Sequence, residues 1–133
     1  MDRSDDLSYD KKISGSGTFE KRGAGKLTVT GNNDYAGTTT ISAGTLQIGN
    51  GGGTGSINGD IVNNSKLIVD RSNNIDFTHV LSGTGTLEKQ GTGSLTVSGD
   101  NSAFSGATTV SAGACRRREA WYRNCYGCER CIA

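Results

Sequence analysis

The sequence contains no long run of apolar residues. No stretch approaches the roughly 20 consecutive apolar residues of a transmembrane helix. The residues that follow Met1 are Asp-Arg-Ser-Asp-Asp, without the apolar segment of a secretory signal peptide. We therefore expect this chain neither to insert into a membrane nor to direct its own export.

Proline is absent, aromatic residues make up 6% of the chain, and hydrophobic residues make up 32%. Ordinary globular domains contain roughly 45–50% apolar residues, a range that also counts glycine. A chain of 133 residues with this composition cannot fill a thick core between two layers. It can fill a narrow core, to which each short strand contributes two or three inward side chains.

Cysteine is absent from residues 1–114, and all four cysteines lie in residues 115–133 with the only tryptophan. Charge divides at the same place. Nine Lys and Arg against eleven Asp and Glu give −2 before this point, and five Arg against two Glu give +3 after it. This change in composition and charge falls inside a sequence motif that occurs twice in the chain, as described below. A shift of the reading frame would produce such a change. We therefore expect residues 115–133 to be a Cys/Arg-rich tail that is disordered or out of frame.

A helical period of 3.6 residues is also missing from residues 1–114. Instead, short runs rich in Thr, Val and Ile alternate with period two. Examples are Phe19/Lys21, Leu27/Val29 and Leu67/Val69. Gly, Asn, Asp and Ser separate these runs at the places where the chain must turn. The pattern predicts an all-β fold.

The stretch ISGSGTFEKRGAGKLTVTGNN at residues 13–33 occurs twice. It returns at residues 81–101 as LSGTGTLEKQGTGSLTVSGDN, with 13 of 21 positions identical after a shift of 68. The similarity extends in both directions, which gives copies at about residues 1–48 and 69–114 and a spacer at 49–68. Repetition of this kind is typical of stacked units that share one core.

Regular strand spacing and near-identical copies favour a solenoid over a sandwich or a closed barrel. If the 68-residue shift equals three coils, one coil takes about 23 residues, and residues 1–114 make about five coils. Equivalent residues would then stack in one column, about 14 Å apart at roughly 4.8 Å per strand. Both ends of such a stack expose strand edges, so we expect self-association end to end.

The string ISGSGTFEKRGAGKLTVTGNNDYAGTTTISAGTLQIG resembles the passenger-associated transport repeat of bacterial autotransporters. With the second copy and the linking stretch GSINGDIVNNSKLIVDRSNNIDFTHV, the resemblance covers roughly residues 1–114. It implies a right-handed parallel β-helix in the extracellular passenger of a type V secreted protein, often an adhesin, whose parent protein resides at the outer membrane. The family pattern also includes a signal peptide and an outer-membrane barrel. We expect neither in this chain, which would then be a fragment.

Two glycine-rich stretches match known ligand-binding loops only in part. Residues 23–28 lack the first glycine of a phosphate-binding loop, because Glu20 stands there, and a strand is expected to follow instead of a helix. Residues 52–55 lack the aspartate of the calcium-binding nonapeptide, because Ile57 occupies its place. We interpret the second stretch as a flexible corner and expect no cofactor.

Charged pairs recur with the repeat. They are Asp2-Arg3 with Asp70-Arg71, and Glu20-Lys21 with Glu88-Lys89. A catalytic site is needed once, whereas solvated charges on turns and strands can be copied. Neighbouring residues on a strand also point to opposite faces, which separates an acid from a base. We predict no catalytic residue, interpret these charges as solvated, and expect His79 to be an exposed strand residue.

The tail holds one chemically rich pattern. Cys125, Cys128 and Cys131 form CxxCxxC, and Cys115 precedes them. Four thiolates can bind zinc, but structural zinc sites usually present two CxxC-type pairs on separate knuckles. An iron–sulfur run would need a further cysteine followed by proline. We predict no metal site, with these four cysteines as the only candidates.

The sequence therefore predicts a structural or adhesin-type part of an autotransporter passenger, which supports surface display or translocation without catalysis. Expected partners are host or bacterial surface molecules, contacted through the parent protein, and further copies of the chain. Two alternatives remain. One is a fragment of a polysaccharide-active β-helix enzyme, which needs a non-repeated acidic cleft. The other is a small metal- or nucleic-acid-binding module in residues 115–133, although five arginines alone are a weak indication.

Overall fold

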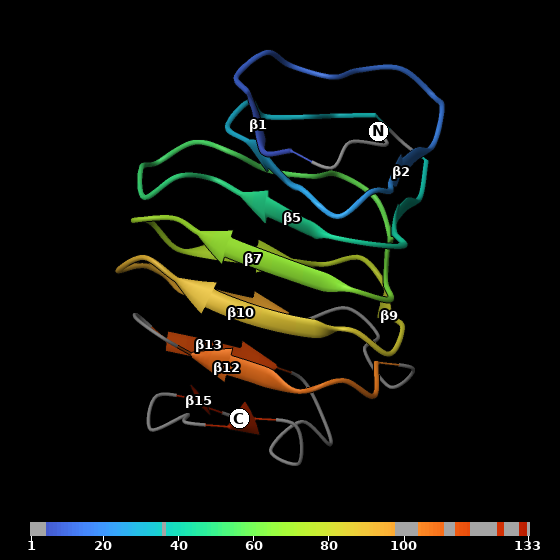
Figure 1. The fold of residues 1–133 in the computed structure, drawn as a ribbon. Coiled ribbons are helices and arrows are strands. Elements are labelled where there is room, and N and C mark those ends of the chain that lie inside the picture. The colour runs from blue at the N-terminus through green and yellow to red at the C-terminus, as the bar shows by residue number, and fades with distance from the viewer. Residues whose placement is uncertain are drawn as a thin grey trace.

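The computed structural model describes residues 5–35, 37–97 and 104–109 with their side chains, and the backbone of residues 110, 114–117, 125–126 and 131–132. Within these residues the chain forms short strands, which pair in parallel, and no helix. Figure 1 shows the strands stacked in successive coils along one axis, from blue at one end to red at the other. The prediction of an all-β, parallel β-helix is confirmed.

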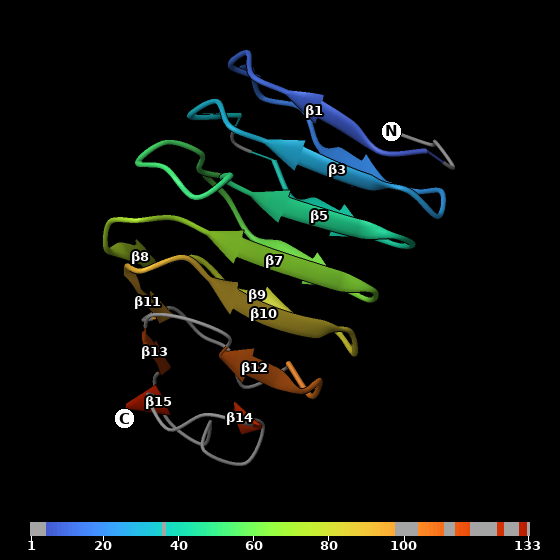
Figure 2. The same ribbon diagram turned by 60° about the vertical axis from the view of Figure 1, so that its left-hand side comes forward.

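The strands form three walls, each of which is one sheet. Wall A contains β1 (Leu7–Tyr9), β3 (Lys26–Val29), β5 (Thr45–Ile48), β7 (Lys66–Asp70), β10 (Thr86–Gln90), β12 (Thr108–Val110) and β14 (Cys125–Tyr126). Wall B contains β8 (Ile75–Phe77), β11 (Ser94–Val97), β13 (Ala114–Arg117) and β15 (Cys131–Ile132). Wall C contains β2 (Phe19–Lys21), β4 (Thr39–Ile41), β6 (Ile61–Asn63) and β9 (Leu81–Ser82). In Figure 2 wall A is the ladder that runs the length of the molecule.

Inward side chains form columns because the register is kept from coil to coil. In wall A, successive register partners form a column of leucines, which are Leu27, Leu46, Leu67 and Leu87. Each is at most 3% exposed. Burial of one such side chain stabilises a fold by about 1.5–3 kcal/mol. The narrow core of stacked aliphatic side chains therefore contributes to holding the coils together.

One coil is shorter than the repeat length predicts, so the predicted coil length is wrong. Residues that face each other in neighbouring coils, such as Ile13 and its hydrogen-bond partner Asn33, are typically 20 positions apart. Phe19 begins a column on wall C that continues through Thr39, Ile61 and Leu81. Its equivalent in the second copy, Leu87, lies beyond the end of this column and on wall A. The shift between the copies therefore equals three coils plus one wall, and equivalent residues do not share a column.

The following strand shows the same displacement. Leu27 lies on wall A, whereas its equivalent Leu95 lies on wall B, where it pairs with Ile75. All walls require the same short alternating strand and a tight corner, so one sequence fits any of them. The prediction of about five coils is confirmed, because the six strands of wall A from β1 to β12 enclose five coil steps.

Glycine is required at several corners because the preceding coil passes very close. A Cβ atom on Gly25 would lie 2.1 Å from the backbone oxygen of Asp5, and one on Gly93, its equivalent, 2.0 Å from that of Asn73. Real Cβ atoms essentially never approach another atom within 3.0 Å. Gly17 differs, because a Cβ there would have nothing within 4 Å. The stacking of coils therefore selects glycine at particular corners.

The described parts of the last nineteen residues continue walls A and B. β13 pairs with β11, β15 pairs with β13, and β14 pairs with β12. The remaining residues of this tail lie outside the described residues. The prediction that residues 115–133 are disordered or out of frame stays a prediction.

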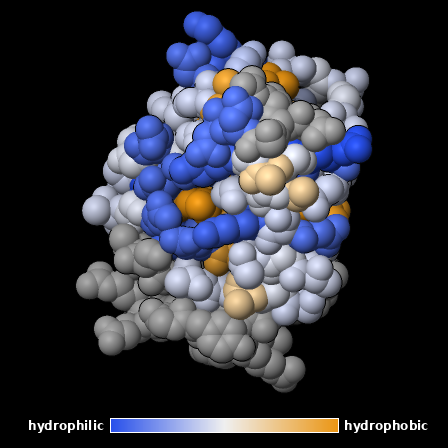
Figure 3. Space-filling model, in the orientation of Figure 1, coloured by the Kyte–Doolittle hydropathy of each residue, from blue (hydrophilic) through white to orange (hydrophobic). Residues whose placement is uncertain are grey.

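Polar residues dominate the outer surface on the face shown in Figure 3, where apolar residues appear as small separate patches. Among the described residues, the exposed large hydrophobic side chains are Tyr9 and Val80, at 38% and 40% exposure. No helix in the described part of the chain is long and apolar enough to cross a membrane.

Candidate functional site

Two lysines lie inside the solenoid. Lys21 on wall C and Lys89 on wall A are 1% and 0% exposed, and they occupy equivalent positions of the two copies. Lys21 Nζ donates to the backbone carbonyl groups of Arg22 and Gly23, at 2.7 and 2.9 Å. Lys89 Nζ donates to the same two positions of its own corner. The interpretation of these lysines as solvated is wrong, because corner carbonyl groups replace water around each ammonium group.

The glutamates beside these lysines point outward. Glu20 is exposed, and its carboxylate accepts a hydrogen bond from Ser42 Oγ at 2.8 Å. The carboxylate of Glu88 lies 3.1 Å from Lys66 Nζ and accepts a bond from Gln90 Nε2 at 2.7 Å. The expected separation of neighbouring acidic and basic residues to opposite faces is confirmed.

Arg71 holds a glycine-rich corner of the preceding coil. Its guanidinium group donates to the carbonyl groups of Gly55 and Gly53, at 2.7 and 2.8 Å, and to Asn73 Oδ1 at 3.0 Å. The side chain is 9% exposed, and this burial lowers the pKa of Arg71 from its ordinary value. Arg71 is therefore not a solvated charge, and it fixes the backbone of the corner that the sequence suggested was flexible.

An opening interrupts the wall of the solenoid beside β8. Ser72 N donates to the carbonyl oxygen of Gly52 at one end, and Ile61 N donates to that of Val80 at the other, both at 2.9 Å. Between these two bonds, no backbone hydrogen bond joins residues 53–60 to residues 73–79. β8 is accordingly the edge strand of wall B. One rung of this wall is therefore not closed by backbone pairing.

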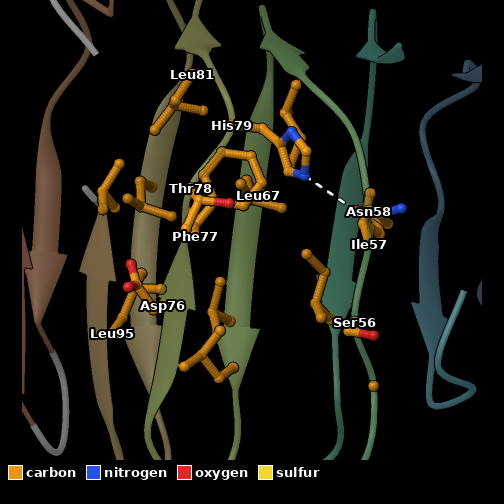
Figure 4. Close-up of a pocket in the computed structure, with 17 residues that line it drawn as sticks. Ser56, Ile57, Asn58, Leu67, Asp76, Phe77, Thr78, His79, Leu81 and Leu95 are labelled. Carbon is orange, nitrogen blue, oxygen red and sulfur yellow. Dashed lines mark hydrogen bonds between the residues drawn. The ribbon is translucent and has the colours of Figure 1, made fainter. Parts of the chain in front are cut away.

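Side chains cross the opening instead. His79 Nε2 and Asn58 Oδ1 are joined by a hydrogen bond of 3.0 Å (Figure 4). His79 Nδ1 also lies 3.8 Å from Asp60 Oδ1, which accepts a bond from Val80 N at 3.0 Å. His79 follows β8 in a bend and is half-buried. The expectation that it is an exposed strand residue is wrong, because it reaches across to the preceding coil.

A cavity of about 240 Å³ lies beneath the opening, inside the solenoid. Eleven of its 17 lining residues are aliphatic or aromatic, so its interior is apolar. Its walls include Ile57, Leu67, Ile75, Phe77 and Leu81. The other six lining residues are Gly55 and five polar residues that lie at or near the surface (Figure 4): Ser56, Asn58, Asp76, Thr78 and His79. The described residues thus form an apolar cavity with a polar rim.

The sequence does not predict this cavity, which borders the spacer between the two copies. Residues 50–56, Asn-Gly-Gly-Gly-Thr-Gly-Ser, carry no large apolar side chain. Within the wall segment of residues 50–60, Ile57 is the one large apolar residue, and it lines the cavity. A run of small residues opposite an alternating strand such as Ile75–Phe77 is the signal that could have indicated a gap.

Three of the four candidate cysteines have a described backbone, and they lie on two walls. Cys115 and Cys131 are register partners on wall B, whereas Cys125 pairs with Thr108 on wall A. Cys128 lies outside the described residues. The described residues contain no group of three or more His, Cys, Asp and Glu that could hold a metal ion. The absence of a metal site stays a prediction.

Comparison with known proteins identifies both copies of the repeat. The family described as Passenger-associated-transport-repeat matches residues 19–48, from β2 through β5, and residues 87–114, from β10 to the start of β13. The Adhesin BmaC autotransporter of Brucella suis biovar 1 (strain 1330) is 60% identical over 55 residues, which is 41% of this chain and 2% of that protein. No solved structure matches the chain. The two stretches match passenger-associated transport repeats, and over these residues the chain is similar to autotransporter passengers.

Proposed function

We propose that this chain is a structural element of the passenger, which supports surface display or translocation of the parent protein without catalysis. The continuous wall A carries this proposal, because each of its strands pairs only with strands of the neighbouring coils. A new coil can therefore fold on the previous coil without contacts to distant parts of the chain. Stepwise folding of this kind suits a polypeptide that emerges gradually through a membrane.

The outer surface supports the same proposal. On the face in Figure 3 the apolar patches are small and separated by polar residues. Large contiguous apolar patches usually mark interaction sites on proteins. A mostly polar stack of coils suits a spacer that stands in water at the cell surface, where we place the parent protein.

Adhesion is a second candidate function. The relative from Brucella suis is named an adhesin, and the identity of 60% favours a related role for this chain. The matched residues are 2% of that protein, so its name does not by itself assign adhesion to these residues. Host or bacterial surface molecules are the partners that this candidate requires.

Surface display tests the structural proposal. The chain is placed between a signal peptide and an outer-membrane barrel, and protease-accessible protein is measured on intact cells. Gly93→Val should lower the displayed amount several-fold at equal synthesis, because its side chain would collide with the backbone of Asn73. Gly17→Val is the matched control, since its corner has open space. Equal display of the two variants would overturn the proposal.

Adhesion is measured separately with beads coated with the purified full chain. Beads that bind no more cells than albumin-coated beads would remove adhesion as a function of this chain, and would leave the display result unaffected. Binding that persists in Gly17→Val and disappears in Gly93→Val would support adhesion by the folded coils.

A further inference from the structure

We propose that the cavity beneath the opening binds a small neutral molecule with an apolar body the size of one aromatic ring and one hydroxyl group at the rim. The volume is sufficient, because engineered apolar cavities of roughly 150 Å³ bind benzene. The cavity here has about 240 Å³, which accommodates a ring with small substituents.

The interior favours an apolar body. Leu67 from wall A, Ile75 and Phe77 from wall B and Leu81 from wall C converge on the cavity, and Ile57 lines it from the opposite side of the opening. Water bound in such a chamber would find few hydrogen-bond partners. Its replacement by hydrocarbon removes apolar surface from water on both the ligand and the protein. Ligand sites in proteins commonly combine an apolar interior with a few polar groups.

The rim favours a hydroxyl group. Asn58 and His79, already joined across the opening, present an amide and an imidazole to a ligand that enters there. A hydroxyl group both donates and accepts, so it suits either tautomer of His79. Asp60 near His79 and Asp76 on the rim are acidic, and they disfavour a carboxylate at this place. The ligand class is therefore a phenol or a small apolar alcohol.

The opening provides the entry path. Because no backbone hydrogen bond crosses it between the described segments, a ligand can enter when His79 and Asn58 rotate, and the wall need not unfold. Asn58 is exposed, and rotation of exposed side chains takes picoseconds to nanoseconds. Arg71 fixes the far end of the opening through Gly53 and Gly55, so the cavity keeps its shape during entry.

Titration of the full chain with p-cresol, followed by amide NMR shifts, tests the proposal. Saturable binding is expected at about 1 mM or below, with shifts concentrated at residues 55–58 and 75–81. Toluene has the same body without the hydroxyl, and it should bind about 3- to 10-fold more weakly. If neither probe shows saturable binding to the folded chain, the proposal is overturned. Equal affinities for p-cresol and toluene would overturn the inference that the rim binds a hydroxyl group.

Variants locate the site. Ile57→Phe fills the cavity and should weaken p-cresol binding at least 10-fold, whereas Ile68→Phe, outside the cavity lining, should leave it unchanged. His79→Ala should weaken p-cresol and leave toluene unchanged, and it keeps the test decisive if Ile57→Phe fails to fold. Two results would overturn the assignment. One is unchanged binding of p-cresol by folded Ile57→Phe, and the other is an equal loss of affinity for p-cresol and toluene in His79→Ala.

Discussion

Replacement of either buried lysine by methionine should destabilise the solenoid. Methionine has a similar length and no branch, so Lys21→Met and Lys89→Met preserve the packing and remove only the ammonium group. In each copy this group satisfies two backbone carbonyl groups of the corner that follows its strand. These carbonyl groups stay in place after the substitution, and they then face a methyl group.

The expected magnitude follows from opposing effects. Each hydrogen bond from a charged donor contributes about 1.5–3 kcal/mol to stability. Removal of the ammonium also removes the cost of burying a charge, which offsets part of this loss. We expect each variant to lower the free energy of unfolding by about 2–4 kcal/mol. The two sites are three coils and one wall apart, at least roughly 14 Å along the axis, so the double variant should show the sum within about 0.5 kcal/mol.

Urea unfolding followed by circular dichroism measures these differences. Lys66→Met is the control, because this side chain is 43% exposed and pairs with Glu88 at the surface. Its loss should cost at most about 1 kcal/mol. If Lys21→Met and Lys89→Met unfold at the wild-type midpoint, the buried ammonium groups contribute no net stability and the reasoning is refuted. Unequal losses of stability in the two variants would show that wall C and wall A do not provide the same environment for the buried ammonium group.

Three further predictions concern stability and association. Gly25→Ala should cost about 1–3 kcal/mol, since its Cβ would collide with the backbone of Asp5, and Gly17→Ala should stay within about 0.5 kcal/mol; identical urea midpoints would contradict this. Burial raises the pKa of Tyr35, and its hydrogen bond to Thr39 lowers it by less. Above about pH 10 the unfolded chain therefore loses this proton first, so stability falls with pH up to the folded-state pKa. Tyr35→Phe should flatten that fall in a series of thermal midpoints, and a flat wild-type curve would refute it. We also propose that the edge strands β1 and β2 pair with another copy, so light scattering should show size rising over micromolar concentrations, whereas a constant monomer would exclude this.

The fold could be predicted because alternation and duplication both report on side-chain direction. Leu27 and Val29 point inward as their spacing predicts, and parallel stacking follows from the copies. The coil length could not be predicted, because a shift of three coils plus one wall preserves every strand and corner of the pattern. Because the same sequence is compatible with all three walls, it does not indicate on which wall it lies.

Residue type misled the interpretation where alternation was correct. Lys21 shares the inward face with Phe19 by the period of two, yet its charge suggested solvent. The compensating groups are backbone carbonyl groups, which no residue letter reveals. The cavity was hidden for a related reason, because it depends on the distance between two segments that do not pair. His79 gains its role only when Asn58 of the neighbouring coil lies beside it.

The interchangeable walls have a consequence for how such proteins lengthen. A duplicated segment need not contain a whole number of coils, because the inserted copy can begin after any corner of the solenoid. The outward residues of the second copy then face another direction: Glu20 projects from wall C, and its counterpart Glu88 projects from wall A. Growth by such copying displays one chemical pattern around the axis of the molecule, so an approaching surface meets it from more than one side.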